Sequence, residues 1–295
     1  MTMRTPLSVS LTGAFFLITS AAAAQDEPAG LMKQDAATGG ATDVATAGFE
    51  APVAAEGEDK DTTEANLSAG ALVTTGNARS LALTGAGKYR LRRAENQFSA
   101  ALAANYARSA SDPDSDTETT VENLQGKLRY DRFVSKNVAV FIAMSGRRDR
   151  FQGLDLRLNV DPGVAYYFID EKAQQLWAEG GYDLQYDVRR DENIEAAAAT
   201  GETLDKTETR HNGRLFAGYD NAVSESVSFN TGVEYLQDVQ ETKNWRLNWD
   251  VGLTSSIGKG FSIATTFSLK YDNNPLPDVE KTDTVTAVSL VYKLL

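Results

Sequence analysis

The sequence predicts an all-β protein: an antiparallel up-and-down transmembrane β-barrel of about twelve strands, preceded by a disordered tail. The first observation is alternation, since Trp245, Leu247 and Trp249 share one face of a segment whose other face carries Arg246 and Asn248. Successive side chains of a strand point to opposite faces, so such a segment has one apolar and one polar face. The other two observations are the length of these segments and the alternating length of their connections.

Each alternating segment is longer than the mean strand of about 5–6 residues in soluble proteins. Short connections alternate with others that include the long ones at residues 109–118, 191–206 and 273–281, as in barrels with short turns at one end. A soluble β-sandwich is the alternative, but it predicts shorter strands and a polar outer face. The expected strands are residues 66–75, 79–91, 95–108, 119–132, 137–149, 154–168, 174–190, 207–220, 226–239, 244–257, 260–272 and 283–294.

Residues 1–24 have the pattern of a secretory signal peptide. Arg4 provides the positive start, residues 7–20 form the apolar core, and Ala22-Ala23-Ala24 fits a cleavage site for small residues. The core is too short to span a membrane as a helix. We therefore expect export and removal of this segment.

Residues 25–65 are predicted to be a disordered acidic tail rich in Ala, Thr and Gly, and residues 66–295 to be the barrel. This tail holds ten acids and two lysines, a net charge of −8, whereas the whole chain carries −12. Its composition buries too little apolar area to offset the entropy of ordering. The acidity therefore resides mostly in the tail, and it argues against nucleic acid as a partner.

Aromatic residues near the segment ends are typical of the girdles at both membrane interfaces. We expect Tyr106, Trp245 and Tyr271 near the outer rim. The residues expected near the periplasmic rim are Tyr89, Tyr130, Tyr166, Phe168, Tyr219 and Tyr292. The predicted lipid-facing and girdle residues are Tyr89, Tyr106, Tyr130, Tyr166, Tyr219, Trp245, Trp249, Phe267, Tyr271 and Tyr292.

Charged residues on the polar faces are expected to line the lumen, because a basic residue in the lipid costs about 2–4 kcal/mol at the midplane. One reading is a closed lumen, held rigid by salt bridges, and we favour it. The other is a hydrophilic channel, since twelve strands lie between the filled ~8-stranded and the open ~16-stranded cases. The predicted lumen network is Lys88, Arg90, Lys127, Arg129, Arg147, Asp149, Asp155, Arg157, Glu179, Asp183, Arg214, Glu234, Arg246 and Asp250.

Catalytic, metal-binding and cofactor-binding patterns were sought and not found in the sequence. His211 is the one histidine, it falls on the predicted lipid face, and there is no cysteine. The acidic run at residues 112–116 is interpreted as a solvated loop. Gly85-Ala86-Gly87 lacks the third glycine of a dinucleotide fingerprint. We therefore expect no enzyme, no cofactor and no metal.

Three stretches carry a resemblance to one family. They are residues 70–77, residues 148–157 with the run Asp-Arg-Phe-Gln-Gly-Leu-Asp-Leu-Arg, and residues 270–275, Lys-Tyr-Asp-Asn-Asn-Pro, followed by Lys-Thr-Asp-Thr at 281–284. The chain resembles the DUF481 family of YdiY-like, salt-induced outer membrane proteins over about residues 66–295. The resemblance implies an outer-membrane barrel without an established activity.

One feature departs from the family, whose members tend to end in an aromatic residue. Leu294 and Leu295 stand here, so recognition by the barrel-assembly machinery is expected to rest on Val288, Leu290 and Tyr292 of the last strand.

The sequence thus leaves two classes of function in an outer-membrane protein of a Gram-negative bacterium. One is a structural or stress-related protein with a charge-paired, narrow lumen. The other is a narrow, porin-like channel for small hydrophilic solutes, and an outer-membrane enzyme is a distant third. The expected surroundings are outer-membrane lipid and lipopolysaccharide.

Overall fold

A computed structural model describes residues 61–74, 79–110, 116–150, 152–171, 173–199, 201, 203–275 and 281–294. The predicted signal peptide and residues 25–60 of the predicted tail lie outside these described residues. The strands are β1 Thr62–Thr74, β2 Arg79–Arg93, β3 Asn96–Ala110, β4 Glu118–Phe133, β5 Val138–Asp149, β6 Leu154–Asp170, β7 Gln174–Arg189, β8 Thr207–Ser224, β9 Val227–Asp238, β10 Trp245–Gly258, β11 Phe261–Asp272 and β12 Thr282–Lys293; the helix α1 is Asp191–Ala199.

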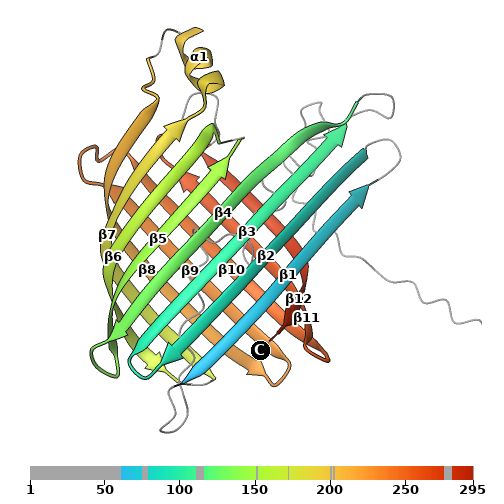
Figure 1. Cartoon of the computed structure of the whole chain (residues 1–295), viewed down its shortest axis with the longest axis vertical. Coiled ribbons are helices and arrows are strands. Elements are labelled where there is room, and N and C mark those ends of the chain that lie inside the picture. The colour runs from blue at the N-terminus through green and yellow to red at the C-terminus, as the bar shows by residue number, and fades with distance from the viewer. Residues whose placement is uncertain are drawn as a thin grey trace, which may run out of the picture.

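The twelve described strands form one closed barrel in which each strand pairs antiparallel with its sequence neighbours (Figure 1). The strands are strongly inclined, as closure of a sheet requires. Closure is made by β1 and β12 over the four residue pairs from Asn66↔Lys293 to Ala69↔Leu290. The predicted fold class is therefore confirmed, and both ends of the barrel sequence lie at the same end of the barrel.

The connections differ between the two ends of the barrel. The end that holds the start of β1 and the end of β12 carries short turns, and we call it the turn end; the other, which carries α1, is the loop end (Figure 1). The turn between β10 and β11 places Gly258 and Gly260 at φ 103° and 80°, and Lys259 at φ 54°. Glycine adopts such left-handed angles without steric cost, so these two glycines favour the tight reversal.

Three local features differ from the sequence prediction. β1 begins at Thr62 rather than residue 66, because Thr62–Ala65 pair with the end of β2, where Glu64 lies opposite Arg90. β8 continues to Ser224 through pairing with β9. The loop at residues 191–206 contains α1, whose alanines favour a helix and whose first turn holds Asp191 and Glu192 beside the positive end of the helix dipole.

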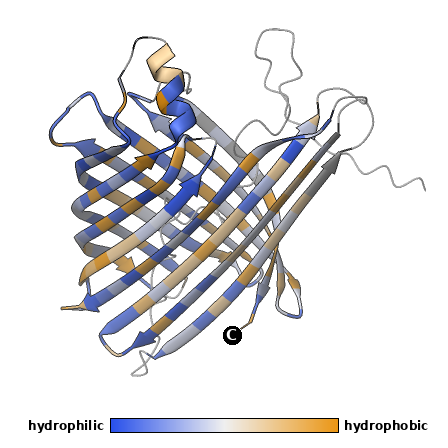
Figure 2. Cartoon of the chain, turned by 45° about the horizontal axis from the view of Figure 1, so that its top comes forward, coloured by the Kyte–Doolittle hydropathy of each residue, from blue (hydrophilic) through white to orange (hydrophobic). Residues whose placement is uncertain are grey.

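The barrel is apolar outside and polar inside, the reverse of a soluble domain. Polar and apolar residues alternate along its strands (Figure 2). On β4, the outward Leu124 and Leu128 are each 51% exposed, whereas the inward Gln125, Lys127 and Arg129 are 1–7% exposed. Because side chains alternate along every strand, each strand contributes one row to each surface. The outer surface therefore fits lipid, and the polar groups gather in the lumen.

Glycine at position 218 is required by the ring packed against it. A Cβ built on Gly218 would lie 2.2 Å from Cζ2 of the Trp177 side chain, whereas one on Gly180 would lie 3.9 Å from its nearest neighbour. We expect Gly218→Ala to lower the free energy of unfolding by about 1–3 kcal/mol, because the indole must leave its packing position. Urea unfolding in detergent micelles measures this, with Gly180→Ala as the matched control. Equal stability of the two variants would contradict the packing described here.

Candidate functional site in the barrel lumen

Four charged side chains form a continuous series of ion pairs on the inside of the barrel. Arg129 Nη1 of β4 lies 2.7 Å from Glu179 Oε1 of β7, and Arg214 Nη1 of β8 lies 2.8 Å from Glu179 Oε2. Arg214 Nε donates to Glu234 Oε1 of β9 at 2.6 Å. Since β5 and β6 separate β4 from β7, the Arg129–Glu179 pair connects strands that are not neighbours in the wall. We call these four residues the central ion-pair chain.

The hydrogen bonds at both ends of the central ion-pair chain extend the network. Its four side chains are only 2–8% exposed. Arg129 also donates from Nε and Nη2 to Asp131 Oδ1, at 2.9 and 2.7 Å, and Asn248 Nδ2 donates to Glu234 Oε2 at 3.0 Å. Buried ion pairs stabilise a fold only when such secondary hydrogen bonds are made, and the loss of one partner leaves a buried charge uncompensated. The chain is therefore a rigid element with a high cost of disruption.

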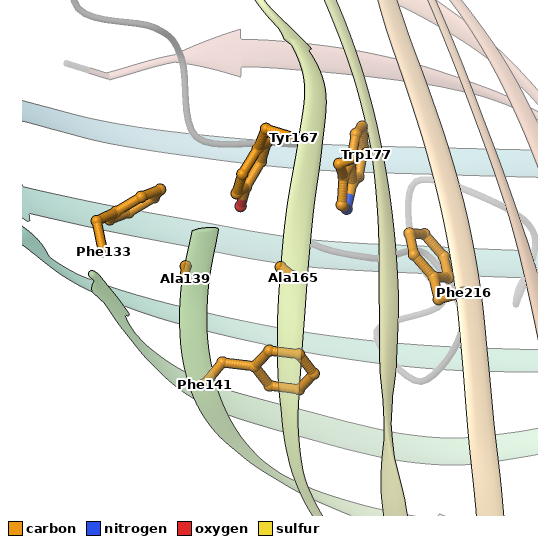
Figure 3. Close-up of a cluster of buried hydrophobic side chains, with 7 residues drawn as sticks. All are labelled: Phe133, Ala139, Phe141, Ala165, Tyr167, Trp177 and Phe216. Atoms are coloured by element: carbon orange, nitrogen blue, oxygen red, sulfur yellow. The ribbon is translucent and has the colours of Figure 1, made fainter. Parts of the chain in front are cut away.

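An aromatic layer accompanies the central ion-pair chain along the inner wall. Figure 3 shows its side chains, which pair as Phe133 with Tyr167 and as Trp177 with Phe216, each with ring centroids 5.8 Å apart. Such separations fit attractive aromatic packing. The alanines between the rings leave room for them. The layer consists of Phe133, Ala139, Phe141, Ala165, Tyr167, Trp177 and Phe216, all less than 7% exposed.

The aromatic layer and the ion pairs are joined by cation–π contacts. The guanidinium carbon of Arg129 lies 4.0 Å from the ring centre of Phe141, and that of Arg214 lies 5.5 Å from the ring centre of Phe216. Trp177 Nε1 donates to Glu179 Oε1 at 3.3 Å. Contacts of this kind are stronger when desolvated. Rings and charges thus fill this side of the lumen together, from β4 to β9.

A polar cavity of about 170 Å³ lies in the lumen beside the central ion-pair chain and extends toward the loop end. Arg157 donates to both carboxylate oxygens of Asp187, at 2.8 and 2.7 Å. Asp183 accepts from Asn159 and Asn212, at 2.7 and 2.8 Å. We call this cavity the vestibule; its lining includes Gln125, Arg147, Arg157, Asn159, Asp161, Asp183, Asp187, Arg189, Glu208, Arg210, Arg214, Glu234, Arg246, Asn248, Lys270, Asp272 and Lys281.

Exposed ion pairs hold the base of α1 to β6 at the loop end. Lys206 Nζ lies 2.7 Å from Asp191 Oδ1 and 3.3 Å from Asp155 Oδ2, and Arg190 donates to Glu192 at 2.8 Å. The hydrogen bond to Asp191 raises the pKa of Lys206, and the one to Glu192 raises the pKa of Arg190. A base whose pKa is raised in the folded state contributes its full stability below its unfolded pKa. That stability is lost as the pH rises through the folded pKa, so both pairs persist at neutral pH.

Ten of the charged residues predicted for the lumen are at most 8% exposed, namely Arg90, Lys127, Arg129, Arg147, Asp149, Glu179, Asp183, Arg214, Glu234 and Asp250. Several predicted lumen residues have partners outside the predicted network: for example, Arg90 pairs with Glu64 at 3.2 Å, Asp250 accepts from Ser268, and Arg157 pairs with Asp187. Arg147 pairs with Asp149 on the same strand at 2.6 Å. Lys127 is 4% exposed, whereas Lys88 is half-buried.

Asp155 is a predicted lumen residue that does not line the vestibule. Alternation predicts that it shares a face of β6 with Arg157, but the register shifts between Leu154 and Leu156. Asp155 accepts from Arg190 and Lys206 at the loop end, and its side chain is 42% exposed. From the sequence we expect Arg157 and Asp155 to meet partners of opposite sign among Arg147, Asp149, Glu179 and Asp183, whereas the structure pairs Arg157 with Asp187. Alternation identifies the face of a residue, whereas its depth and partner follow from the tilt and stagger of the strands.

Sequence reasoning missed the aromatic layer. Trp177 and Phe216 are not among the residues predicted from the sequence for the girdles or the lumen. Trp177 follows the same alternation as Glu179, and Phe216 the same as Arg214. The parity of these positions would have placed the rings inside. Among the predicted girdle residues, Tyr89, Tyr106, Tyr130, Tyr166, Trp249 and Tyr292 lie on the outer face and are 37–48% exposed, and Tyr219, Trp245, Phe267 and Tyr271 are half-buried.

His211 lies half-buried on β8, where its Nδ1 shares a hydrogen bond with the Tyr182 hydroxyl. In the part of the chain that the structure describes, no cluster of three or more His, Asp or Glu side chains could hold a metal ion. Among the same residues, no helix has the length and apolar character needed to cross a membrane.

A closed antiparallel barrel with a lipid-compatible outer surface and a charged interior defines the class of the outer-membrane β-barrel proteins. More particularly, the chain belongs to the DUF481 family, described as a protein of unknown function, whose family model matches residues 67–294. The family resemblance seen in the sequence is thereby confirmed. A comparison with curated proteins found no match.

Several solved barrels have a similar arrangement of strands. The NanC porin has a TM-score of 0.48 at 10% identity, covering 79% of this chain and 100% of that one. The translocator domain of the autotransporter NalP from Neisseria meningitidis has a TM-score of 0.41 at 11% identity, covering 78% and 86%. The KdgM porin has a TM-score of 0.39 at 8% identity, covering 78% and 98%.

Proposed function

We propose that this protein resides in the outer membrane as a structural or stress-related barrel whose lumen is closed to steady conduction. The central ion-pair chain carries this proposal, because Arg129 and Glu179 connect strands that are not neighbours in the wall. An open channel needs water between opposite walls, whereas these side chains are 2–8% exposed. The aromatic layer adds apolar bulk at the same place.

The orientation that we propose puts the turn end in the periplasm and the loop end outside the cell. Barrels of this class have short periplasmic turns and longer external loops. It follows that the predicted signal peptide, residues 1–24, is removed on export and that the acidic residues 25–60 remain periplasmic. The barrel-assembly machinery would meet Val288, Leu290 and Tyr292, which are 40–63% exposed on the outer face of β12.

The alternative is a narrow channel for small hydrophilic solutes. The vestibule favours it, because a polar cavity leads from the loop end toward the central ion-pair chain. Under this alternative the side of the lumen opposite β4–β9 conducts.

Conductance of the refolded protein in a planar bilayer separates the two functions. We expect no steady current from protein whose folding is verified by its altered migration on an unheated gel. A steady current of the size that a water-filled pore gives would overturn the closed lumen and favour the channel. A refolded porin in the same bilayer serves as the positive control.

A further inference from the structure

Three of the six arginines that line the vestibule lie on alternate strands of the wall. Arg157 belongs to β6, Arg210 to β8 and Arg246 to β10, and all three line the cavity. Each guanidinium is permanently charged and offers five N–H donors in a planar fork. The like charges of these arginines repel one another, since Arg246 is repelled by both Arg157 and Arg210.

The carboxylates in contact with these arginines do not match them in number. Arg157 uses both oxygens of Asp187. Arg210 Nη2 lies 3.0 Å from Glu208 Oε2, but this same oxygen also accepts from Arg189 at 2.5 Å. Arg246 forms no ion pair with any carboxylate in the described part of the chain. Arg246 is therefore the arginine of this group that has no carboxylate in direct contact.

The hydrogen-bond donors show the same deficit. Arg246 Nη2 donates to the Gln185 side-chain oxygen, and the remaining donors of this guanidinium have no acceptor among the described residues. Arg210 Nε is buried and also has no hydrogen-bond partner there. Asp183 and Asp272 attract Arg246 from a greater distance. A buried donor without an acceptor destabilises the fold, and an arriving acceptor would recover that loss.

We propose that the vestibule is a binding site for a small oxyanion, held between Arg210 and Arg246 with Arg157 alongside. Phosphate, sulfate and carboxylate share the planar or tetrahedral oxygens that guanidinium forks bind with two hydrogen bonds. The volume of about 170 Å³ is below the ~300–1,000 Å³ of pockets for drug-sized ligands, so the ligand is a small anion and not a long chain. Asn248, which also lines the cavity, offers a further polar contact.

Calorimetric titration of the refolded protein in neutral detergent tests this site. Inorganic phosphate and succinate are the two probes, each at constant ionic strength in chloride buffer. We expect saturable binding of at least one probe. The probe that binds with the higher affinity shows whether the site prefers an inorganic or an organic acid. No saturable binding of either probe would overturn the proposal.

The variant Arg246→Gln distinguishes a binding role from a structural one. We expect at least a tenfold loss of affinity together with a higher unfolding temperature in the absence of anion, because the change removes a charge opposed by its neighbours. A structural role for Arg246 predicts a lower unfolding temperature instead, and that result would contradict the site.

Arg148→Gln is the matched control, since Arg148 lies exposed on the outer face of β5 and should leave affinity unchanged. Arg210→Gln is a second test variant, which should also weaken binding at least tenfold. Equal losses in Arg148→Gln and Arg246→Gln would mean that the anion responds only to net charge. The inference goes beyond the closed lumen: a conducting wild type would refute the closure, whereas the titrations and the unfolding temperature of Arg246→Gln decide the anion site.

Discussion

Glu179→Gln is expected to lower the free energy of unfolding by roughly 3–5 kcal/mol, the cost of breaking a buried ion pair. The glutamine keeps the shape of the side chain but leaves Arg129 and Arg214 without the carboxylate that they share. Urea titration of the protein in micelles measures the loss. The same variant should show current in a planar bilayer where the wild type shows none, because two like charges then repel inside the lumen.

Glu122→Gln provides the control for this experiment. Glu122 pairs with Arg150 at 3.6 Å, and both side chains are more than 40% exposed, so the change should cost only about 0–1 kcal/mol. If both variants lost equal stability, the central ion-pair chain would not be the stabilising element. A Glu179→Gln protein as silent in the bilayer as the wild type would show that closure depends on the aromatic layer instead.

Leu102→Arg is expected to reduce insertion into lipid vesicles severely. Leu102 is 58% exposed on the outer face near the middle of β3, where a guanidinium would face hydrocarbon at a cost of about 2–4 kcal/mol. The fraction of folded protein is read from the faster band on an unheated gel after dilution from urea into vesicles.

Val134→Arg is the matched control for depth. Val134 is 59% exposed, nearly the same as Leu102, but it lies in the turn between β4 and β5. Its replacement should leave folding almost unchanged, because an arginine there reaches water and lipid headgroups. Equal damage from both substitutions would contradict the membrane position of the outer face.

Ser268→Arg is expected to impair folding, although alternation alone predicts a mild effect because Ser268 faces the lumen. Ser268 faces inward and is therefore away from lipid, yet it is 1% exposed and donates to Asp250. Arginine at this position would have to displace closely packed neighbours. Facing the lumen is thus no guarantee of space, because this lumen is largely filled.

The sequence alone determined the strands and their faces. The alternation that places Leu124 outside and Gln125 inside is a property of the extended backbone, and it holds whatever the strand pairs with. Twelve segments joined by turns of alternating length were sufficient to predict the closed barrel, which the structure confirms. The DUF481 motifs were local as well, so the family could be identified without any tertiary contact.

Only the tertiary structure decided which inward residues meet. The Arg129–Glu179 contact joins positions 50 residues apart on strands that are not neighbours, and the shared face that alternation predicts for Arg157 and Asp155 did not bring them to the same place. Depth along the barrel depends on strand tilt, on register and on the number of strands, which are properties of the closed sheet. The aromatic layer, the vestibule and its unpaired arginine arise from that geometry, because alternation specifies the direction of a side chain and not its neighbours across the lumen.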